Sequence, residues 1–151
     1  MKDMKSRLII GNLLNTAGLM LLITLWTYAF FIKIIDFNHY QNQMADQPFP
    51  IFFQGILTYG LLITEAIAAI LLIIGKKLSG LILSLMLLIA FTIYILLILN
   101  GAFPERPCSC GGFISKMSWK NHLKFNLVLI AINSFCLYTM SKKGRRLAVT
   151  A

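Results

Sequence analysis

The sequence predicts an all-α membrane protein, a bundle of four transmembrane helices with both termini in the cytoplasm. Three observations lead to this prediction. The 151 residues are 58% hydrophobic and 13% charged, whereas soluble domains average about 45–50% and about 25%. Four segments are apolar over the roughly 20 residues that a membrane-crossing helix needs. Basic residues gather in short clusters between and beyond these segments.

The composition also excludes other classes of protein. A mean hydropathy of +0.79 leaves too much apolar surface for the core of a small water-soluble domain, and it is too high for a disordered chain. The formal net charge of +9 would fit a nucleic-acid-binding protein. Here the clusters sit where the positive-inside rule places them, so the lipid bilayer is the expected partner and nucleic acid is not.

The four predicted spans belong to one membrane domain that occupies the whole chain, residues 1–151. The first span follows a basic start, as a signal peptide would. Its apolar part is longer than the roughly 7–15 residues of a signal core, and no small-residue cleavage site closes it, so we expect it to be retained. The spans cover residues 8–35, 56–74, 78–99 and 123–140, and the two long connections cover 36–55 and 100–122.

The basic residues also predict the orientation. Nine lie on the side of the two termini and of the Lys76–Lys77 turn, and at most five lie on the other side. The positive-inside rule therefore places both termini in the cytoplasm and both long connections outside. We expect a multi-pass protein of the bacterial inner (cytoplasmic) membrane. The inward set is Lys2, Lys5, Arg7, Lys76, Lys77, Lys142, Lys143, Arg145 and Arg146; the outward set is Arg106, Lys116, Lys120, Lys124 and, at the margin, Lys33.

The first long connection contains an apolar pattern. Phe37, Tyr40 and Met44 recur at spacings that place them on one face of a short helix, which we expect to lie at the membrane interface. Pro48 and Pro50 are expected to end this helix and to redirect the chain into the second span.

The second long connection carries Cys108 and Cys110, two of the three cysteines in the chain. The predicted orientation puts them in a compartment where thiols are oxidised. Three interpretations remain open. The pair could exchange disulfides with a partner, because a strained, exposed disulfide is reactive. It could be a structural staple, although closing so short a loop stabilises weakly. It could bind zinc with His122, although three ligands fall short of the usual four.

Two further residues need an explanation. Cys136 lies inside the fourth span, where a cysteine is usually an inert packing residue, and we place it too far along the helix to reach the pair. Glu65 lies in the middle of the second span, where an ionisable group is costly and is a functional candidate. Lys33 could reach inward to it or extend to the lipid head groups. Alternatively, a protonated Glu65 could bond an Asn or Thr across the bundle, the candidates being Asn12, Asn15, Thr24 and Thr92.

Small and polar residues in or beside the predicted spans lead to further predictions about helix packing. Gly55, Gly60 and Gly80 are expected to allow close helix contacts. Asn121 is expected to cap the fourth span, and two asparagines inside that span are expected to bond across the bundle. This pair is Asn126 and Asn133.

The run Pro107-Cys-Ser-Cys-Gly-Gly-Phe113, with the following segment from Met117 to Asn126, resembles the MauE/DoxX-like redox-associated membrane proteins, especially those of Bacteroidetes. The stretch Ile32-Lys-Ile-Ile-Asp-Phe37 and Glu65 also fit that pattern. The resemblance implies a compact four-helix membrane bundle. It implies maturation of disulfide-rich periplasmic proteins, as for MauE, or quinone-coupled sulfur oxidation, as for DoxX. The related quinone-linked proteins of the vitamin K epoxide reductase kind carry two cysteine pairs, whereas this chain has one pair and Cys136.

These observations support two functional hypotheses. In the first, the protein is a redox accessory in which Cys108 and Cys110 exchange disulfides with an extracytoplasmic thioredoxin-like or client protein. Glu65 and Lys33 would then form a polar pocket, for example for a quinone, although the sequence names no cofactor. In the second, the bundle is a non-enzymatic subunit of a larger membrane complex. A third interpretation, that the protein is a small transporter, is supported by Glu65 alone. The sequence leaves open whether the protein is an enzyme.

Overall fold

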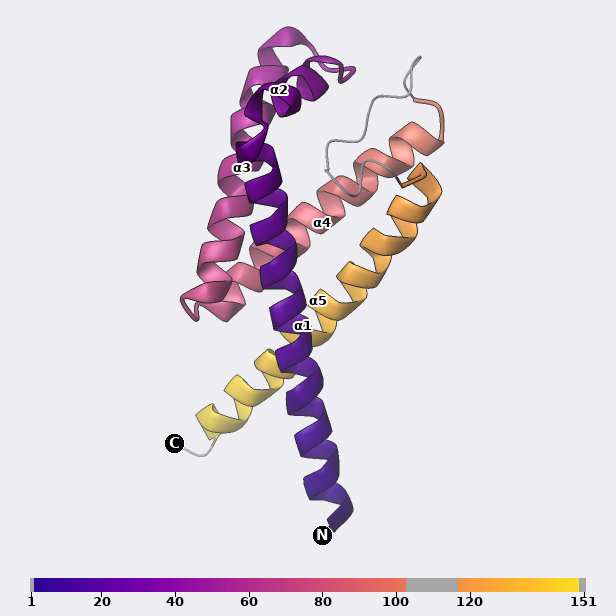
Figure 1. Cartoon of the computed structure of the whole chain (residues 1–151). Helices are drawn as coiled ribbons and strands as arrows, with labels where there is room; N and C mark the ends of the chain where they lie inside the picture. Colours follow the sequence, from indigo (N-terminus) through magenta and orange to yellow (C-terminus); the bar gives the residue numbers. More distant parts are fainter. Residues whose placement is uncertain (1, 103–116, 150–151) are drawn as a thin grey trace.

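Five α-helices make up the described part of the chain (Figure 1). The computed structural model describes residues 2–102 and 117–149, with side chains from residue 9 to residue 142 within those ranges. All helices except the second are long and apolar enough to cross a membrane. The predicted all-helical fold with four membrane-length helices is therefore confirmed. The helices are α1 (Lys2–Ile35), α2 (Phe37–Ala45), α3 (Ile51–Ile73), α4 (Lys77–Leu99) and α5 (Trp119–Val149).

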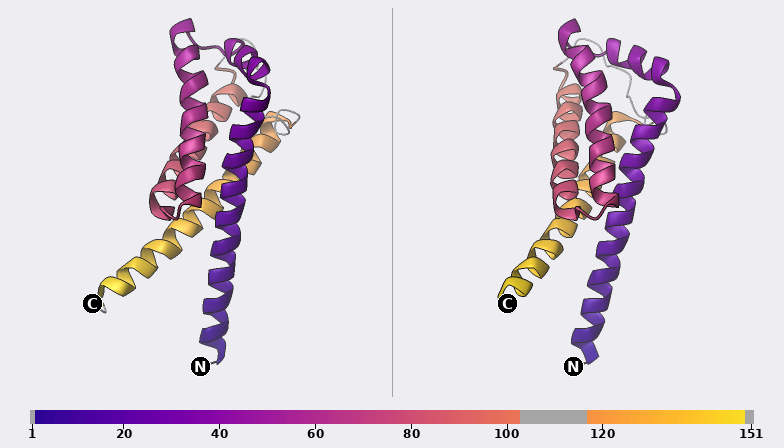
Figure 2. Two further views of the ribbon diagram at one scale, coloured as in Figure 1. Left: turned by 60° about the vertical axis from the view of Figure 1, so that its left-hand side comes forward. Right: turned by 90° about the vertical axis from the view of Figure 1, so that its left-hand side faces the viewer.

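The four long helices pack as a ring in which α1 contacts α3, α3 contacts α4, α4 contacts α5 and α5 contacts α1. The short helix α2 lies across one end of this ring, which we call the α2 end (Figures 1 and 2). At the opposite end, α1 and α5 continue past the α3–α4 turn and diverge toward the two termini. The ring encloses one core, and the termini lie at the same end of the molecule.

The ends of α3 and α4 are set by glycines with positive φ. Gly75 follows α3 with φ of 85°, and Gly101 follows α4 with φ of 71°. Glycine adopts this left-handed conformation without steric cost and so ends helices efficiently. After α4, the backbone N–H of Gly101 donates to Ile98 and that of Ala102 to Leu97. These bonds satisfy carbonyls that the helix end would otherwise leave open.

Helix α2 confirms the short helix predicted from the apolar spacing. Asp36 caps it, because its carboxylate accepts a hydrogen bond from the backbone N–H of His39 at 3.1 Å. Tyr40 and Met44 are buried beneath it, with exposed fractions of 2% and 3%. The hydroxyl of Tyr40 donates to the backbone carbonyl of Thr58 in α3 at 2.9 Å. The apolar face of α2 is thus fastened to the bundle.

All four long helices begin before their predicted spans, α1 at Lys2 rather than at residue 8 and α4 by a single residue. Helix α3 begins at Ile51 rather than at residue 56, because Pro50 occupies the N-cap position, where its missing N–H removes no helix hydrogen bond. Helix α5 begins at Trp119 and runs to Val149, beyond the predicted 123–140 on both sides. The apolar window marks the membrane-length part, whereas Lys and Arg are good helix formers and continue the helix past it.

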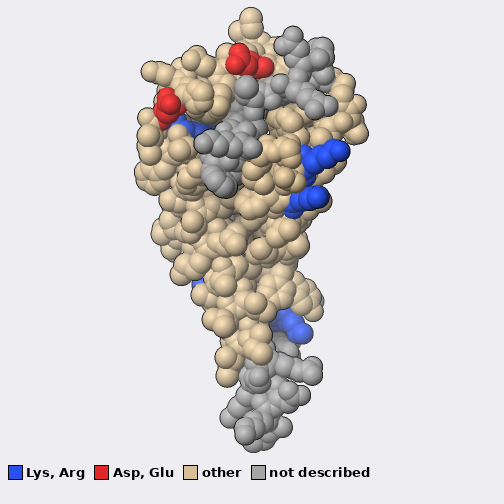
Figure 3. Space-filling view, turned by 45° about the vertical axis from the view of Figure 1, so that its right-hand side comes forward, with Lys and Arg blue, Asp and Glu red and all other residues tan. Residues whose placement is uncertain are grey.

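The core and the surface are both apolar, as expected where lipid is the solvent. Leu22, Leu81 and Leu88 are at most 1% exposed in the centre of the ring. Large apolar side chains are nevertheless exposed along all four long helices, for example Met20, Ile63 and Ile93. Most of the surface seen in Figure 3 is uncharged, and the acidic side chains visible there lie toward the α2 end. Such a surface would aggregate in water, so it indicates contact with lipid.

Candidate functional site

A buried ion pair joins α1 to α3. The ammonium nitrogen of Lys33 lies 2.7 Å from each carboxylate oxygen of Glu65. Glu65 is 1% exposed and Lys33 is 6% exposed. Lys33 also donates to the backbone carbonyl of Ala29 at 3.3 Å, and it lies 5.7 Å from the ring centroid of Tyr40. Lys33 therefore reaches inward, and Glu65 is held by a cation rather than by Asn or Thr.

The ion pair borders a small cavity of about 80 Å³, which we call the ion-pair cavity. Its wall also contains Trp26 from α1 and His122 and Asn126 from α5. The indole N–H of Trp26 is already used, because it donates to the hydroxyl of Ser84 at 2.8 Å. Lys33 and Glu65 thus border a cavity, and the polar binding pocket expected there stays a prediction. The cavity is small compared with the roughly 300–1,000 Å³ of ordinary ligand sites.

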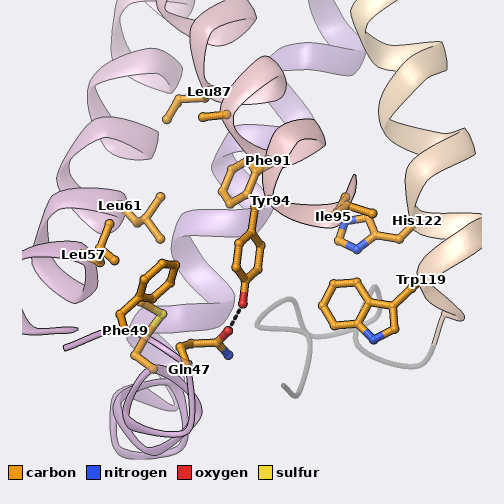
Figure 4. Close-up of a pocket in the computed structure, with 12 residues that line it drawn as sticks. Gln47, Phe49, Leu57, Leu61, Leu87, Phe91, Tyr94, Ile95, Trp119 and His122 are labelled. Atoms are coloured by element: carbon orange, nitrogen blue, oxygen red, sulfur yellow. Dashed lines mark hydrogen bonds between the residues drawn. The ribbon is translucent and has the colours of Figure 1, made fainter. Parts of the chain in front are cut away.

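A larger cavity of about 260 Å³ lies at the α2 end between α3, α4 and α5, and we call it the α2-end cavity (Figure 4). Its described lining is apolar and aromatic and carries no Asp, Glu, Lys or Arg. Figure 4 shows Phe91 and Tyr94 of α4 in the middle, with Leu57 and Leu61 of α3 on one side and Trp119 on the other. The full described lining is Met44, Gln47, Phe49, Leu57, Leu61, Leu87, Ala90, Phe91, Tyr94, Ile95, Trp119 and His122.

The segment between α2 and α3 closes one side of the α2-end cavity. The hydroxyl of Tyr94 bonds the side-chain oxygen of Gln47, as the dashed line in Figure 4 shows. Phe49 packs on the same Tyr94 ring, with 5.7 Å between the ring centroids. The amide nitrogen of Gln54 donates to the carbonyls of Ala45, Gln47 and Phe49 at 3.0–3.3 Å. This connection is therefore built as a fixed cover.

His122 belongs to the walls of both cavities, as does Phe91. The His122 ring stacks on Trp119, with centroids 6.1 Å apart and an interplanar angle of 25°. Its Nδ1 atom is buried and has no hydrogen-bond partner in the described part of the chain. A buried polar atom without a partner costs about 1–3 kcal/mol, so such an atom calls for an explanation.

Hydrogen bonds join α5 to α4, two helices that each contribute residues to the walls of both cavities. The side-chain amide of Asn126 donates to the carbonyl of Leu88 at 2.9 Å and to the hydroxyl of Thr92 at 2.8 Å. Asn133 makes the equivalent bonds to Leu81 and Ser84, both at 3.2 Å. The two asparagines thus bond across the bundle as predicted, and they fix the register of α5 against α4.

Cys108 and Cys110 lie outside the described residues, and so does any zinc site that would include them with His122. The connection that carries them leaves α4 after Leu99 and enters α5 at Trp119. Trp119 lines the α2-end cavity. Cys136 is fully buried, and its sulfur lies 3.7 Å from the carbonyl oxygen of Asn15. Cys136 packs in the half of the bundle nearer the termini, far along α5 from the start of the helix.

The sequence reasoning missed the α2-end cavity. Gln47, Phe91 and Tyr94 were not singled out, because nothing in their spacing sets them apart. A signal existed in α4, where Phe91 and Tyr94 are three residues apart and so share one face of the helix. The space between that face and α3 depends on packing, which a sequence pattern does not encode.

Residues 10–139 match the family of the methylamine utilisation protein MauE. That range includes most of α1, all of α2, α3 and α4, and most of α5. This chain belongs to the MauE family. No curated protein and no solved structure matches it. As a MauE-family chain with four membrane-length helices, it is a multi-pass membrane protein.

Membership in the MauE family confirms the predicted resemblance and agrees with an accessory role. The matched residues include the ion pair, His122 and the connection with Cys108 and Cys110. The likeness to DoxX and the assignment of the Cys-Ser-Cys-Gly-Gly motif stay predictions.

Proposed function

We propose that this MauE-family protein is an accessory of extracytoplasmic thiol–disulfide chemistry in the bacterial inner membrane. The observation that carries the proposal is the outward-predicted pair Cys108 and Cys110 in the connection between α4 and α5. Two cysteines one residue apart form a small, strained ring when they are oxidised, and strained disulfides react readily with thiols. The partner is a thioredoxin-like protein or a client protein outside the cytoplasm.

The exchange conserves atoms and electrons between the two proteins. A thiolate of the partner attacks one sulfur of a Cys108–Cys110 disulfide, and a mixed disulfide forms. The second thiol of the partner then attacks the mixed disulfide and releases the cysteine. The partner ends as a disulfide and the pair as two thiols, so two electrons and two protons have moved to the pair.

Repeated turnover requires an acceptor for those electrons, and a membrane quinone is the class that we propose. Lys33 and Glu65 are the candidate residues for a polar pocket near it. The ammonium group of Lys33 already donates to both carboxylate oxygens of Glu65. The cavity beside them, of about 80 Å³, is small. A quinone that binds beside Lys33 and Glu65 would therefore have to displace one of them from the ion pair. Otherwise, the quinone would occupy the larger α2-end cavity.

Thiol trapping tests the exchange. Cys110→Ser leaves Cys108 able to form a mixed disulfide that cannot be resolved within the pair, so we expect a covalent partner adduct that reductant releases. Cys136→Ser is the matched control, because Cys136 is fully buried and should not affect trapping. The double change of Cys108 and Cys110 to Ser should abolish the adduct. If this double variant keeps full function in cells, the exchange role is wrong.

A second candidate is a non-enzymatic subunit of a larger membrane complex. The chain has three cysteines, which cannot supply the two pairs of a complete internal electron relay. The described residues also contain no cluster of three or more His, Cys, Asp or Glu that could hold a metal ion. Purification in mild detergent separates the candidates. A stoichiometric partner that remains after the cysteines are changed to Ser supports the subunit, whereas a partner held only by trapping supports exchange.

A further inference from the structure

The α2-end cavity is not fully enclosed, and part of its wall lies on the outer surface of the bundle. Ala90 is part of its wall, is exposed, and lies near the middle of α4. The surface around the middle of a membrane-length helix faces lipid tails. A molecule could therefore enter from the bilayer without crossing the cover formed by Gln47 and Phe49. This route selects for lipid-soluble molecules.

The lining of the α2-end cavity further restricts the class of ligand that could bind there. No charged residue lies among its described lining residues, so nothing there compensates the charge of a phosphate or carboxylate head group. Phe49, Phe91, Tyr94 and Trp119 present flat aromatic faces, which favour stacked or edge contacts with another ring. The volume of about 260 Å³ is near the lower end of ligand sites, which fits a molecule of one or two rings.

Among the described residues of this cavity wall, His122 has a buried polar atom without a hydrogen-bond partner. The Nδ1 atom of His122 is buried and makes no hydrogen bond in the described part of the chain. The stacking of His122 on Trp119 fixes the plane of the ring. A neutral histidine nitrogen donates or accepts according to its tautomer, so an oxygen of a bound ligand could satisfy it either as carbonyl or as hydroxyl.

We propose that the α2-end cavity binds a lipid-soluble, uncharged ring compound that carries an oxygen within hydrogen-bonding reach of His122. The aromatic residues hold the ring and His122 orients the oxygen. Quinones belong to this class, so the inference extends the quinone linkage proposed above. It does not depend on thiol exchange, because its test uses a probe that exchanges neither electrons nor disulfides.

The test measures thermal stability of the full-length purified protein in dodecyl maltoside at a fixed detergent concentration. The probe is 2-naphthol, compared with naphthalene, 2-naphthoate and 1-decanol. A bound probe raises the unfolding midpoint, by about 3–5 °C at ten times its dissociation constant. We expect 2-naphthol to do so, naphthalene to bind about tenfold more weakly for lack of the oxygen, and the other two to have little effect.

Variants locate the binding. Ala90→Phe should fill the opening and abolish the 2-naphthol shift, and Leu61→Phe should do the same from α3 if the first variant does not fold. The matched control is Ile93→Phe, which adds bulk on an exposed face of α4 outside the cavity lining and should keep the shift. His122→Phe should remove the preference for 2-naphthol over naphthalene.

Three results would overturn the proposal. A shift that persists in both cavity-filling variants would mean that 2-naphthol partitions elsewhere. An equal shift with 1-decanol would assign the cavity to lipid chains. No shift with any probe would mean that it is not a site for this class. Each of these results leaves the thiol-trapping experiment untouched, so the two proposals fail separately.

Discussion

The pairing of Lys33 with Glu65 explains how a carboxylate is tolerated inside a membrane bundle. Each charge would be costly alone in a low-dielectric surrounding. With both carboxylate oxygens 2.7 Å from the ammonium nitrogen, the pair presents little net charge to the apolar core. The pair also ties the α2 end of α1 to the middle of α3. Its structural effect can therefore be measured separately from any role in binding.

Removal of one partner should be more damaging than removal of both. Breaking a buried ion pair from one side leaves an unpaired buried charge and costs about 3–5 kcal/mol, whereas apolar replacement of both partners is often close to neutral. We expect Lys33→Met and Glu65→Leu each to lower the unfolding midpoint strongly and the double variant to recover most of the loss. Thermal unfolding in detergent measures all four proteins. Additive losses in the double variant would show that the two side chains do not stabilise each other.

The sequence predicted these two residues because a charged group inside an apolar span is conspicuous in the chain itself. It left their pairing open, since the distance between residues 33 and 65 depends on how α1 packs on α3. His122 was considered only as a weak zinc ligand. Its place in both cavity walls follows from the helix packing and from its stacking on Trp119. Trp119 and His122 are three residues apart and so share one face of α5, but this spacing does not show that the face borders both cavities.

Among the elements, the α3–α4 hairpin shows where small residues matter. A Cβ atom added at Gly80 would lie 2.8 Å from Cγ and Cδ2 of Leu72 and 3.1 Å from its backbone nitrogen. The close contact predicted at Gly80 is therefore present. The same prediction was wrong for Gly55 and Gly60, where an added Cβ would meet nothing within 4 Å. Glycine alone does not reveal which face of a helix meets a neighbour.

Gly80→Ala should therefore destabilise the hairpin, and Gly60→Ala should not. Overpacking a tight contact costs about 1–3 kcal/mol, because side chain or backbone must move. Alanine at Gly60 gains helix propensity of up to about 1 kcal/mol without a clash. Unfolding midpoints of both variants in the same detergent give the comparison. A loss of stability at Gly60 as large as that at Gly80 would contradict the contact argument.

Element starts were predicted less well than element types. Asn121 was expected to cap the fourth span, but α5 begins two residues earlier. The hydroxyl of Ser118 accepts a hydrogen bond from the backbone N–H of Asn121 at 3.4 Å, so Ser118 takes the capping role. Both residues are good caps, and their side-chain chemistry alone does not decide between them. Hydropathy identifies the apolar centre of a span, and local contacts decide where the helix starts.

At the scale of the whole molecule, the contacts that hold the bundle together can be distinguished from the candidate functional residues. The asparagine bonds between α4 and α5 and the packing of Cys136 against α1 hold the ring together. Both cavities lie toward the α2 end, and so do the end of α4 and the start of α5, between which Cys108 and Cys110 stand in the sequence. The proposed function requires that this end face outward. The charge distribution predicts that it does, with nine basic residues on the side of the termini.

Labelling with a membrane-impermeant maleimide tests this orientation. In a background in which Cys108 and Cys110 are Ser, a single cysteine is introduced at an exposed position of α2 (Asn38→Cys) or at an exposed position of α5 near the termini (Ser141→Cys). Cys136 is fully buried and should stay unlabelled. We expect the α2 cysteine to react in intact spheroplasts and the α5 cysteine to react only after lysis. The reverse pattern would place Cys108 and Cys110 in the cytoplasm, where thiols are kept reduced, and would exclude the proposed exchange with an extracytoplasmic partner.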